Sequence, residues 1–129
     1  MIKQDYIVRM IQEIISAIAE AILNKKIIKQ KDWDEYDRIS QQLLGFKSYE
    51  LLNLSKAEII DKYKNDIDGN DKIELVAVNM IKMAEEAENN ILLRNKLRQD
   101  SLFLLNYLQN NSVPSLLRES LITLLRNNG

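Results

Sequence analysis

The stretch DIDGNDKIE at residues 66–74 carries oxygen-bearing side chains at a spacing that could bind a calcium ion. If Asp66 takes the first position of an EF-hand loop, Asp68 takes the third, Asn70 the fifth and Glu74 the ninth. Carboxylate and amide oxygens at these positions are ligands that Ca²⁺ prefers in such loops. The spacing therefore indicates calcium chemistry as one hypothesis for this segment.

Two positions of the loop depart from that pattern. The sixth position, where glycine makes the sharp turn, is Asp71, and the twelfth, where a bidentate glutamate belongs, is Ala77. Without the two carboxylate oxygens of that glutamate, calcium affinity should be millimolar or absent. The segment is therefore interpreted as a turn without a metal site, in which Asn70 or Asp71 caps the next helix. A weak calcium-binding protein with a degenerate EF-hand-like loop at 66–77 stays open as the alternative.

Cysteine and histidine are both missing from the sequence. Their absence excludes disulfides, thiolate nucleophiles, Ser-His-Asp triads and the usual ligands of transition metals. The pair Glu85 and Glu88 in EEAE could supply acid–base groups, but bundles that bind two metal ions normally add histidine ligands, so a solvated face explains the pair better. We expect no enzyme and no cofactor.

Charged residues are balanced over the chain, with 18 Lys and Arg against 19 Asp and Glu. The net charge of −1 favours neither nucleic acid nor an anionic membrane as a partner. Asp100 lies beside a local basic patch that has no interleaved run of aromatic residues, so we expect no nucleic-acid partner. The residues of that patch are Arg94, Lys96 and Arg98.

A second basic group, the run KKIIKQK at 25–31, follows a very apolar helix. This run could dock the helix on an acidic membrane surface. However, Glu13 and Glu20 lie on the polar face of the helix, which favours a buried helix with a charged exit loop. The lysines of the run are Lys25, Lys26, Lys29 and Lys31.

The first element that must position these groups is a strongly amphipathic helix predicted over 4–25. Its polar residues form one narrow stripe, and the remaining apolar sector is so broad that it needs cover on more than one side. We expect this helix to form a protein–protein interface with a second copy of the chain, as a homo-oligomer and specifically a dimer, or with another protein. The expected interface residues are Tyr6, Ile7, Met10, Ile11, Ile14 and Ile18.

The acidic-aromatic segment DWDEYD opens a second predicted helix over 32–44. Acidic residues suit the first turns of a helix, and Gly45 follows the last apolar pair, as expected for a helix end. Trp33 and Tyr36 are spaced to share one helix face, so we interpret them as core or rim aromatics rather than as a cation site.

Further local signals predict the helices of the second half. Ser55 with Glu58 forms a capping box that opens a helix. Helical spacing continues over 72–88 and 91–109, separated by a break at Asn89 and Asn90. A last helix is predicted to start at Asn111 or Ser112, with Pro114 in its first turn.

The three Gly, the single Pro and the lack of alternating apolar and polar segments leave little room for a sheet. The patterns predict one all-α domain over 1–129 with five to six antiparallel helices. These helices could form a stack of helical hairpins of the tetratricopeptide type or a compact bundle. The residue signature of tetratricopeptide repeats does not recur in the chain.

Three segments, QDYIVRMI at 4–11, LLG at 43–45 and YELLNLS at 49–55, resemble landmarks of a family of small uncharacterised bacterial proteins, a domain of unknown function. The resemblance implies a compact, tetratricopeptide-like helical fold. It implies no activity and no functional residues.

We expect a helical protein–protein interaction module in the cytoplasm, because the sequence shows neither a secretory signal nor an apolar run long enough to span a membrane. Self-association through the helix at 4–25 is the expected mode of interaction.

Overall fold

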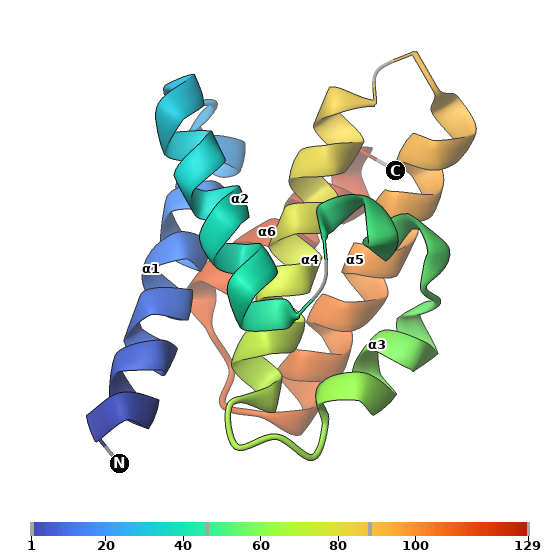
Figure 1. The fold of residues 1–129 in the computed structure, drawn as a ribbon. Coiled ribbons are helices and arrows are strands. Elements are labelled where there is room, and N and C mark those ends of the chain that lie inside the picture. Colours follow the sequence, from blue (N-terminus) through green and yellow to red (C-terminus); the bar gives the residue numbers. More distant parts are fainter. Residues whose placement is uncertain (1, 46, 88, 129) are drawn as a thin grey trace.

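The computed structural model describes residues 2–45, 47–87 and 89–128, and this part of the chain is helical without a strand. The prediction of an all-α fold is confirmed (Figure 1). The helices are α1 (Ile2–Asn24), α2 (Gln30–Leu44), the short 3-10 helix η1 (Ser48–Asn53), α3 (Lys56–Tyr63), α4 (Gly69–Glu86), α5 (Ile91–Asn111) and α6 (Leu116–Asn128).

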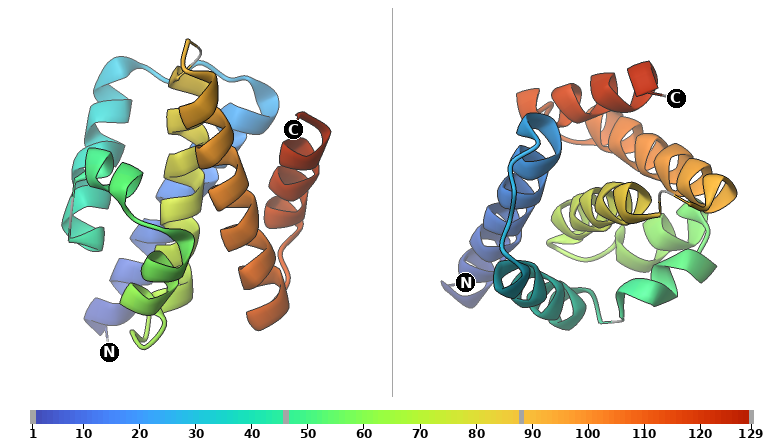
Figure 2. Two further views of the ribbon diagram at one scale, coloured as in Figure 1. Left: turned by 90° about the vertical axis from the view of Figure 1, so that its right-hand side faces the viewer. Right: turned by 90° about the horizontal axis from the view of Figure 1, so that it is seen from above.

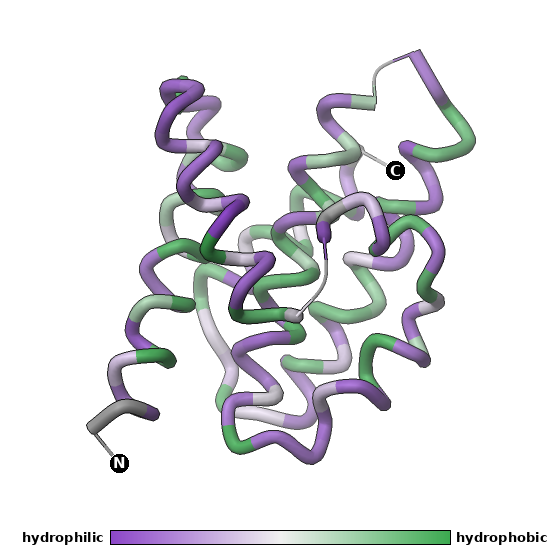
Figure 3. Tube along the Cα trace, viewed as in Figure 1, coloured by the Kyte–Doolittle hydropathy of each residue, from purple (hydrophilic) through white to green (hydrophobic). Residues whose placement is uncertain are grey.

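Helix α4 lies in the middle of the bundle and the other helices surround it (Figure 2). Every residue from Ile73 to Ile81 is buried, which is typical of a helix covered on all sides. Its most extensive contacts are with α5 and α1, and it also meets α2, η1 and α3. Of the two expected arrangements, a compact bundle therefore describes these helices better than a stack of hairpins. The hydropathy colouring in Figure 3 shows the alternation of hydrophilic and hydrophobic residues along the amphipathic helices around α4.

The apolar face of α1 is covered mainly within the chain. Ile11, Ile14 and Ile18 are at most 3% exposed and belong to the hydrophobic core. Their assignment to an interface with another protein is therefore wrong: α1 packs this face against α4 and, less extensively, against α6 and α2. The remaining interface candidates lie nearer the start of α1, where Ile7 and Met10 are half-buried and Tyr6 is 62% exposed.

Several predicted helix boundaries are confirmed. Ser55 caps α3 by accepting a 3.1 Å hydrogen bond from the backbone nitrogen of Glu58, whose carboxylate accepts one from the Ser55 nitrogen. Gly45 ends α2 in the left-handed conformation, with φ of 86°, where glycine carries no steric penalty. The Asn90 side chain caps α5 by accepting a hydrogen bond from the Leu93 nitrogen.

Two boundaries differ from the prediction. Helix α4 begins at Gly69, so neither Asn70 nor Asp71 precedes it as a cap. Helix α6 begins at Leu116, after Pro114, and its first turn is capped by the Ser115 hydroxyl, which accepts a hydrogen bond from the Arg118 nitrogen. The start of α4 depends on the close approach of Gly69 to the Tyr63 backbone, whereas the start of α6 is set by the local cap of Ser115.

Among the described residues, no helix is both long and apolar enough to cross a membrane.

Candidate functional site

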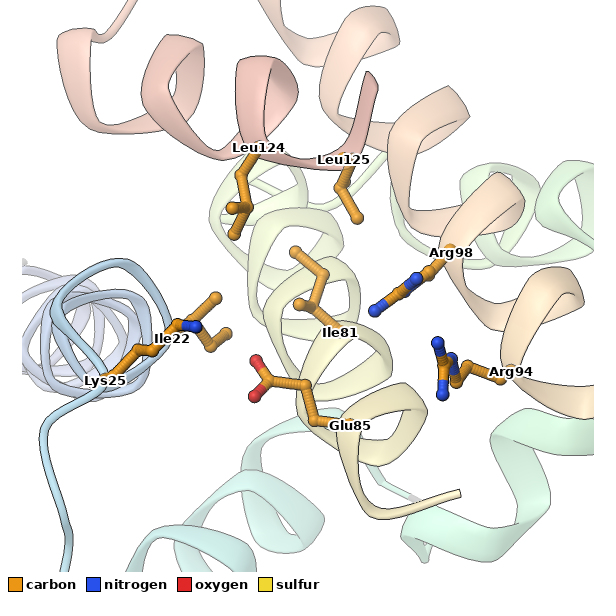
Figure 4. Close-up of a pocket in the computed structure, with 8 residues that line it drawn as sticks. All are labelled: Ile22, Lys25, Ile81, Glu85, Arg94, Arg98, Leu124 and Leu125. Atoms are coloured by element: carbon orange, nitrogen blue, oxygen red, sulfur yellow. The ribbon is translucent and has the colours of Figure 1, made fainter. Parts of the chain in front are cut away.

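A pocket of about 300 Å³ opens where the end of α1, the last turns of α4 and α6 and the start of α5 meet (Figure 4). We call it the end pocket. Basic side chains stand on two of its sides, one carboxylate faces its middle, and aliphatic side chains form the rest of its wall. Its lining residues are Ile22, Lys25, Ile81, Glu85, Arg94, Arg98, Leu124 and Leu125.

A second pocket of about 220 Å³ adjoins the end pocket, since Ile22 and Glu85 line both. It extends toward α2, where the Nζ atom of Lys82 lies 3.8 Å from the centroid of the Trp33 ring, a cation–π contact. The same Nζ atom is 3.5 Å from a carboxylate oxygen of Glu86. We refer to the two adjoining pockets together as the end cleft.

The end cleft carries a surplus of positive charge. Of the described residues that line it, five are cationic and two are carboxylates, a surplus of three positive charges in a chain whose net charge is −1. The cations are Lys25, Lys26, Lys82, Arg94 and Arg98, and the carboxylates are Glu85 and Glu86. A concave region with such a local surplus attracts anionic groups.

Local helix geometry places these side chains. Arg94 and Arg98 are one turn apart on α5, and Ile81 and Glu85 are one turn apart on α4, so each pair shares a helix face. Lys25 follows the end of α1 with φ of 51°, a left-handed conformation that is uncommon for a residue with a side chain. This conformation closes the end of α1, where the Lys26 nitrogen donates a 3.1 Å hydrogen bond to the Ala21 oxygen, as in a Schellman motif.

Among the described residues that line the end pocket, Glu85 is the one carboxylate, and Figure 4 shows it pointing into the space between Lys25 and Arg98. Burial raises the pKa of this carboxyl above its usual range, and it outweighs the opposing influence of the positive charges on Arg98 and Lys25. The adjacent charge of Glu86 raises the pKa further. Glu85 is therefore easier to neutralise than an ordinary surface glutamate.

Exposed apolar side chains flank the cleft at the same end of the bundle. Ile27, in the connection from α1 to α2, is 94% exposed, and Leu92, in the first turn of α5, is 83% exposed. Ile91 beside it is 69% exposed. Figures 1 and 2 show both chain segments at the same end of the molecule. A charged cleft with apolar residues beside it has the composition of a binding surface.

The residues of the alternative interpretation, a calcium loop at 66–77, do not come together around one point. Lys72 forms ion pairs with Asp66 and Asp68, at 3.2 and 3.1 Å, whereas Glu74 pairs with Arg118. Among the described residues, no group of three or more carboxylates is placed to hold a metal ion. The loop at 66–77 is also not formed, because α4 begins at Gly69 and Ala77 is fully buried within it.

The other sequence candidates are divided between the cleft and the exterior. Lys25, Lys26, Arg94 and Arg98 line the cleft, whereas Lys29 and Lys31 are exposed outside it. Lys96 forms an ion pair with Asp100 at 2.8 Å. Trp33 packs edge-to-face on Tyr36, with ring centroids 6.2 Å apart, and it also lines the cleft. Glu88, the proposed partner of Glu85, lies outside the described residues.

Sequence reasoning missed a buried ion pair at the opposite end of α4, between Glu74 and Arg118. These two residues line a separate pocket of about 490 Å³ beside the connection from α5 to α6. A signal for Arg118 was present: it lies one helical turn before Leu121 and Ile122, which are both buried, so it takes a core-facing position.

Fold and site together define a class: a compact all-α bundle with a positively charged cleft at one end. Comparison of the chain with protein families, with curated proteins and with solved structures gave no match. The function proposed below therefore rests on the geometry and charge of the chain itself.

Proposed function

We propose that this protein is a helical protein–protein interaction module and that the end cleft is its binding surface. The observation that carries the proposal is the surplus of three positive charges in a concave region, inside a chain that is slightly acidic as a whole. The partner is a segment of another protein that carries carboxylates beside apolar side chains. Its carboxylates would meet the cations of the cleft, and its apolar side chains would cover the aliphatic wall and the exposed residues beside the cleft.

A protein segment fits the cleft better than a membrane surface. The cations lie within a concavity, where a narrow chain can reach them and a flat bilayer cannot. Glu85 and Glu86 in the same concavity would also be repelled by anionic lipid headgroups. The exposed residues beside the cleft, such as Ile27 and Leu92, are isolated apolar side chains, and they do not form the continuous apolar face of an interfacial helix.

Self-association through α1 remains a second candidate, confined to the exposed start of that helix. Tyr6 and Met10 line a shallow pocket of about 60 Å³ with Arg9 and Glu13, which offers both charges for a reciprocal contact. Sedimentation of the purified chain tests it, and a monomer at tens of micromolar would contradict it. A bacterial origin and a cytoplasmic location remain proposals, the first supported by the resemblance of segments 4–11, 43–45 and 49–55.

The sequence supplies a reporter for the cleft, because Trp33 is its single tryptophan and lines the cleft. We expect a peptide that alternates Glu and Leu to change the Trp33 fluorescence in a saturable manner, and a peptide that alternates Lys and Leu to leave it unchanged. The double variant Lys25→Glu/Arg94→Glu should abolish the response to the acidic peptide.

Arg9→Glu is the matched control, because Arg9 lies about 24 Å from Lys25 along α1 at the usual rise per residue. This variant should respond to the acidic peptide like the unmodified protein. Equal responses to the acidic and basic peptides would contradict the proposal. A response to phosphatidylglycerol vesicles without a response to the acidic peptide would replace the protein partner with a membrane.

A further inference from the structure

We propose that the end pocket is a binding site for a carboxylate attached to an apolar chain, and that Glu85 is the resident counter-ion which this ligand displaces. The inference rests on the proposed function in using the same cleft, and it adds the chemical class of the group that enters the pocket. The carboxylate can belong to a free small molecule or to a side chain or terminus of a protein partner, since the chemistry is the same.

The charge of the end pocket favours an anionic ligand. Lys25, Arg94 and Arg98 approach the pocket from the end of α1 and the first turns of α5, and Glu85 is the one carboxylate among the described residues that line it. Among the described residues, Lys25 and Arg94 form no ion pair. The charge of Glu85 therefore compensates only part of the positive charge around it. A second carboxylate in this space would be stabilised by cations that are already in place.

The aliphatic wall of the end pocket favours a ligand with a hydrocarbon chain. Ile22, Ile81 and Leu125 are each at most 7% exposed, and together with Leu124 they form the aliphatic side of the pocket. A bare inorganic anion would leave this wall in contact with water, whereas the hydrocarbon chain of an organic acid would cover it. The wall therefore favours a carboxylate on an apolar chain over inorganic phosphate.

The position of Glu85 makes its carboxylate a competitor of the ligand. Its carboxylate occupies the space that an incoming carboxylate would take, so the two negative charges compete for the same cations (Figure 4). Like charges at close range disfavour double ionisation, so ligand binding should either displace the Glu85 side chain or neutralise it. In both cases Glu85 opposes binding, and its removal should strengthen binding.

This competition makes binding dependent on pH. Among the described residues, the charged groups that line the two pockets together with Glu85 are Lys25 and Lys26 after α1, Arg94 and Arg98 on α5, and Lys82 and Glu86 on α4 itself. Helix α6 contributes Leu124 and Leu125, which do not titrate. Because the cations keep their charge in acid, protonation of Glu85 increases the positive charge of the pocket. Carboxylate affinity should therefore rise as the pH falls from neutral toward the pKa of Glu85, until the ligand itself is protonated.

The test is a titration of the isotope-labelled full chain with hexanoate, followed by the NMR signals of the Ile and Leu methyl groups. We expect saturable shifts of Ile81 and Leu125. Hexylamine has the same hydrocarbon chain with the opposite charge and should not shift these signals, and inorganic phosphate should bind more weakly than hexanoate. An amidated peptide with a single Glu between Leu residues should compete with hexanoate for the same signals if the pocket also accepts a carboxylate from a protein.

Charge-removing variants measure how much each charged side chain contributes to the hexanoate affinity. At neutral pH, Glu85→Gln should bind hexanoate about threefold more tightly and Arg94→Gln about threefold more weakly, the scale of one partly exposed charge pair. Arg9→Gln, at the other end of α1 and outside the end cleft, should bind like the unmodified protein. Glu85→Gln should also lose the increase in affinity on acidification.

Specific outcomes would overturn the inference. The first is that hexanoate causes no saturable methyl shifts in either the unmodified protein or Glu85→Gln. The second is that hexylamine causes shifts equal to those of hexanoate. The third is that Glu85→Gln binds hexanoate more weakly than the unmodified protein. The backbone amide spectrum shows whether each variant is folded. If hexanoate fails while the Glu–Leu peptide still changes Trp33 fluorescence, the assignment of the end pocket fails and the interaction module stands. If hexanoate binds and the peptide does not, the proposed protein partner fails and the carboxylate site stands.

Discussion

Arg118 binds Glu74 through two of its nitrogens, with Nη2 3.1 Å from Oε1 and Nε 3.3 Å from Oε2. The two side chains are only 8% and 11% exposed. The remaining nitrogen, Nη1, donates hydrogen bonds to the Gln109 side chain at 2.7 Å and to the Val113 carbonyl at 3.1 Å. One guanidinium therefore joins the central helix α4, the end of α5, the following connection and α6.

Removing one side chain of this ion pair should lower the free energy of unfolding more than removing both. Arg118→Met leaves the Glu74 carboxylate buried without its partner, and we expect a loss of about 3 kcal/mol in the free energy of unfolding. The double variant Glu74→Leu/Arg118→Met buries no unpaired charge and should recover part of that loss. Urea unfolding of the three proteins measures the difference. A double variant that is less stable than Arg118→Met would contradict the prediction.

Gly69 begins α4 at a place where a side chain does not fit. A Cβ atom on Gly69 would overlap the backbone carbonyl oxygen of Tyr63, at the end of α3. Gly69→Ala should therefore lower the free energy of unfolding by about 2 kcal/mol, although alanine favours helix formation. Asn70→Ala, at the exposed neighbouring position, is the control and should change stability little. Equal thermal midpoints for the two variants would show that the close approach imposes no strain.

Tyr63 links α3 to the end of α2, because its hydroxyl donates a 2.6 Å hydrogen bond to the Leu44 carbonyl oxygen. Tyr63→Phe should lower the free energy of unfolding by about 1 kcal/mol at neutral pH. Burial raises the pKa of the Tyr63 hydroxyl, so this group favours the folded state below its unfolded pKa of 10.0, and the contribution is lost as the pH rises toward the folded pKa.

The difference in stability between the unmodified protein and Tyr63→Phe should therefore shrink between about pH 9 and pH 11, because only the unmodified protein must keep this hydroxyl protonated to stay folded. Urea midpoints of both proteins at these pH values measure the effect. The other tyrosines are common to both proteins and cancel in the comparison. A difference that grows in alkali would contradict the prediction.

Calcium should not stabilise the folded chain. The ammonium group of Lys72 already pairs with both Asp66 and Asp68, and the Glu74 carboxylate is held by Arg118. A ligand that binds only the folded state raises the unfolding temperature, so a chain without a calcium site should unfold at the same temperature with and without calcium at a few millimolar. An increase specific to calcium and not produced by magnesium would restore the EF-hand-like interpretation.

Local signals predicted most helix boundaries, because capping is a contact between near neighbours in the chain. Ser55 with Glu58 and the left-handed Gly45 are examples in which residue type alone specifies the turn. The start of α4 at Gly69 was mispredicted since it depends on a close approach to the Tyr63 backbone, which no local pattern records.

The sequence could not show, for a related reason, which part of the protein packs on the apolar face of α1. A broad apolar face indicates that a helix must be covered, but it does not say by what. The same limit applies to the end cleft. Lys25 and Arg94 belong to two basic groups that the sequence shows separately, and only the packing of α1 and α5 around α4 brings them into one pocket. Glu85 was recognised as a carboxylate of interest, but the sequence did not indicate that Lys25 and Arg98 are close to it in space.

The raised pKa of Glu85 has a consequence for stability that is separate from ligand binding. A carboxyl with a folded pKa above its unfolded value of 4.5 contributes stability that is fully present below that value and is lost as the pH rises through the folded pKa. At neutral pH the ionised carboxylate therefore opposes folding.

Glu85→Gln removes this penalty, so its urea midpoint should exceed that of the unmodified protein at neutral pH, and the two midpoints should converge in acid. A neutral-pH midpoint for Glu85→Gln below that of the unmodified protein would mean that attraction to Lys25 and Arg98 outweighs the cost of burial.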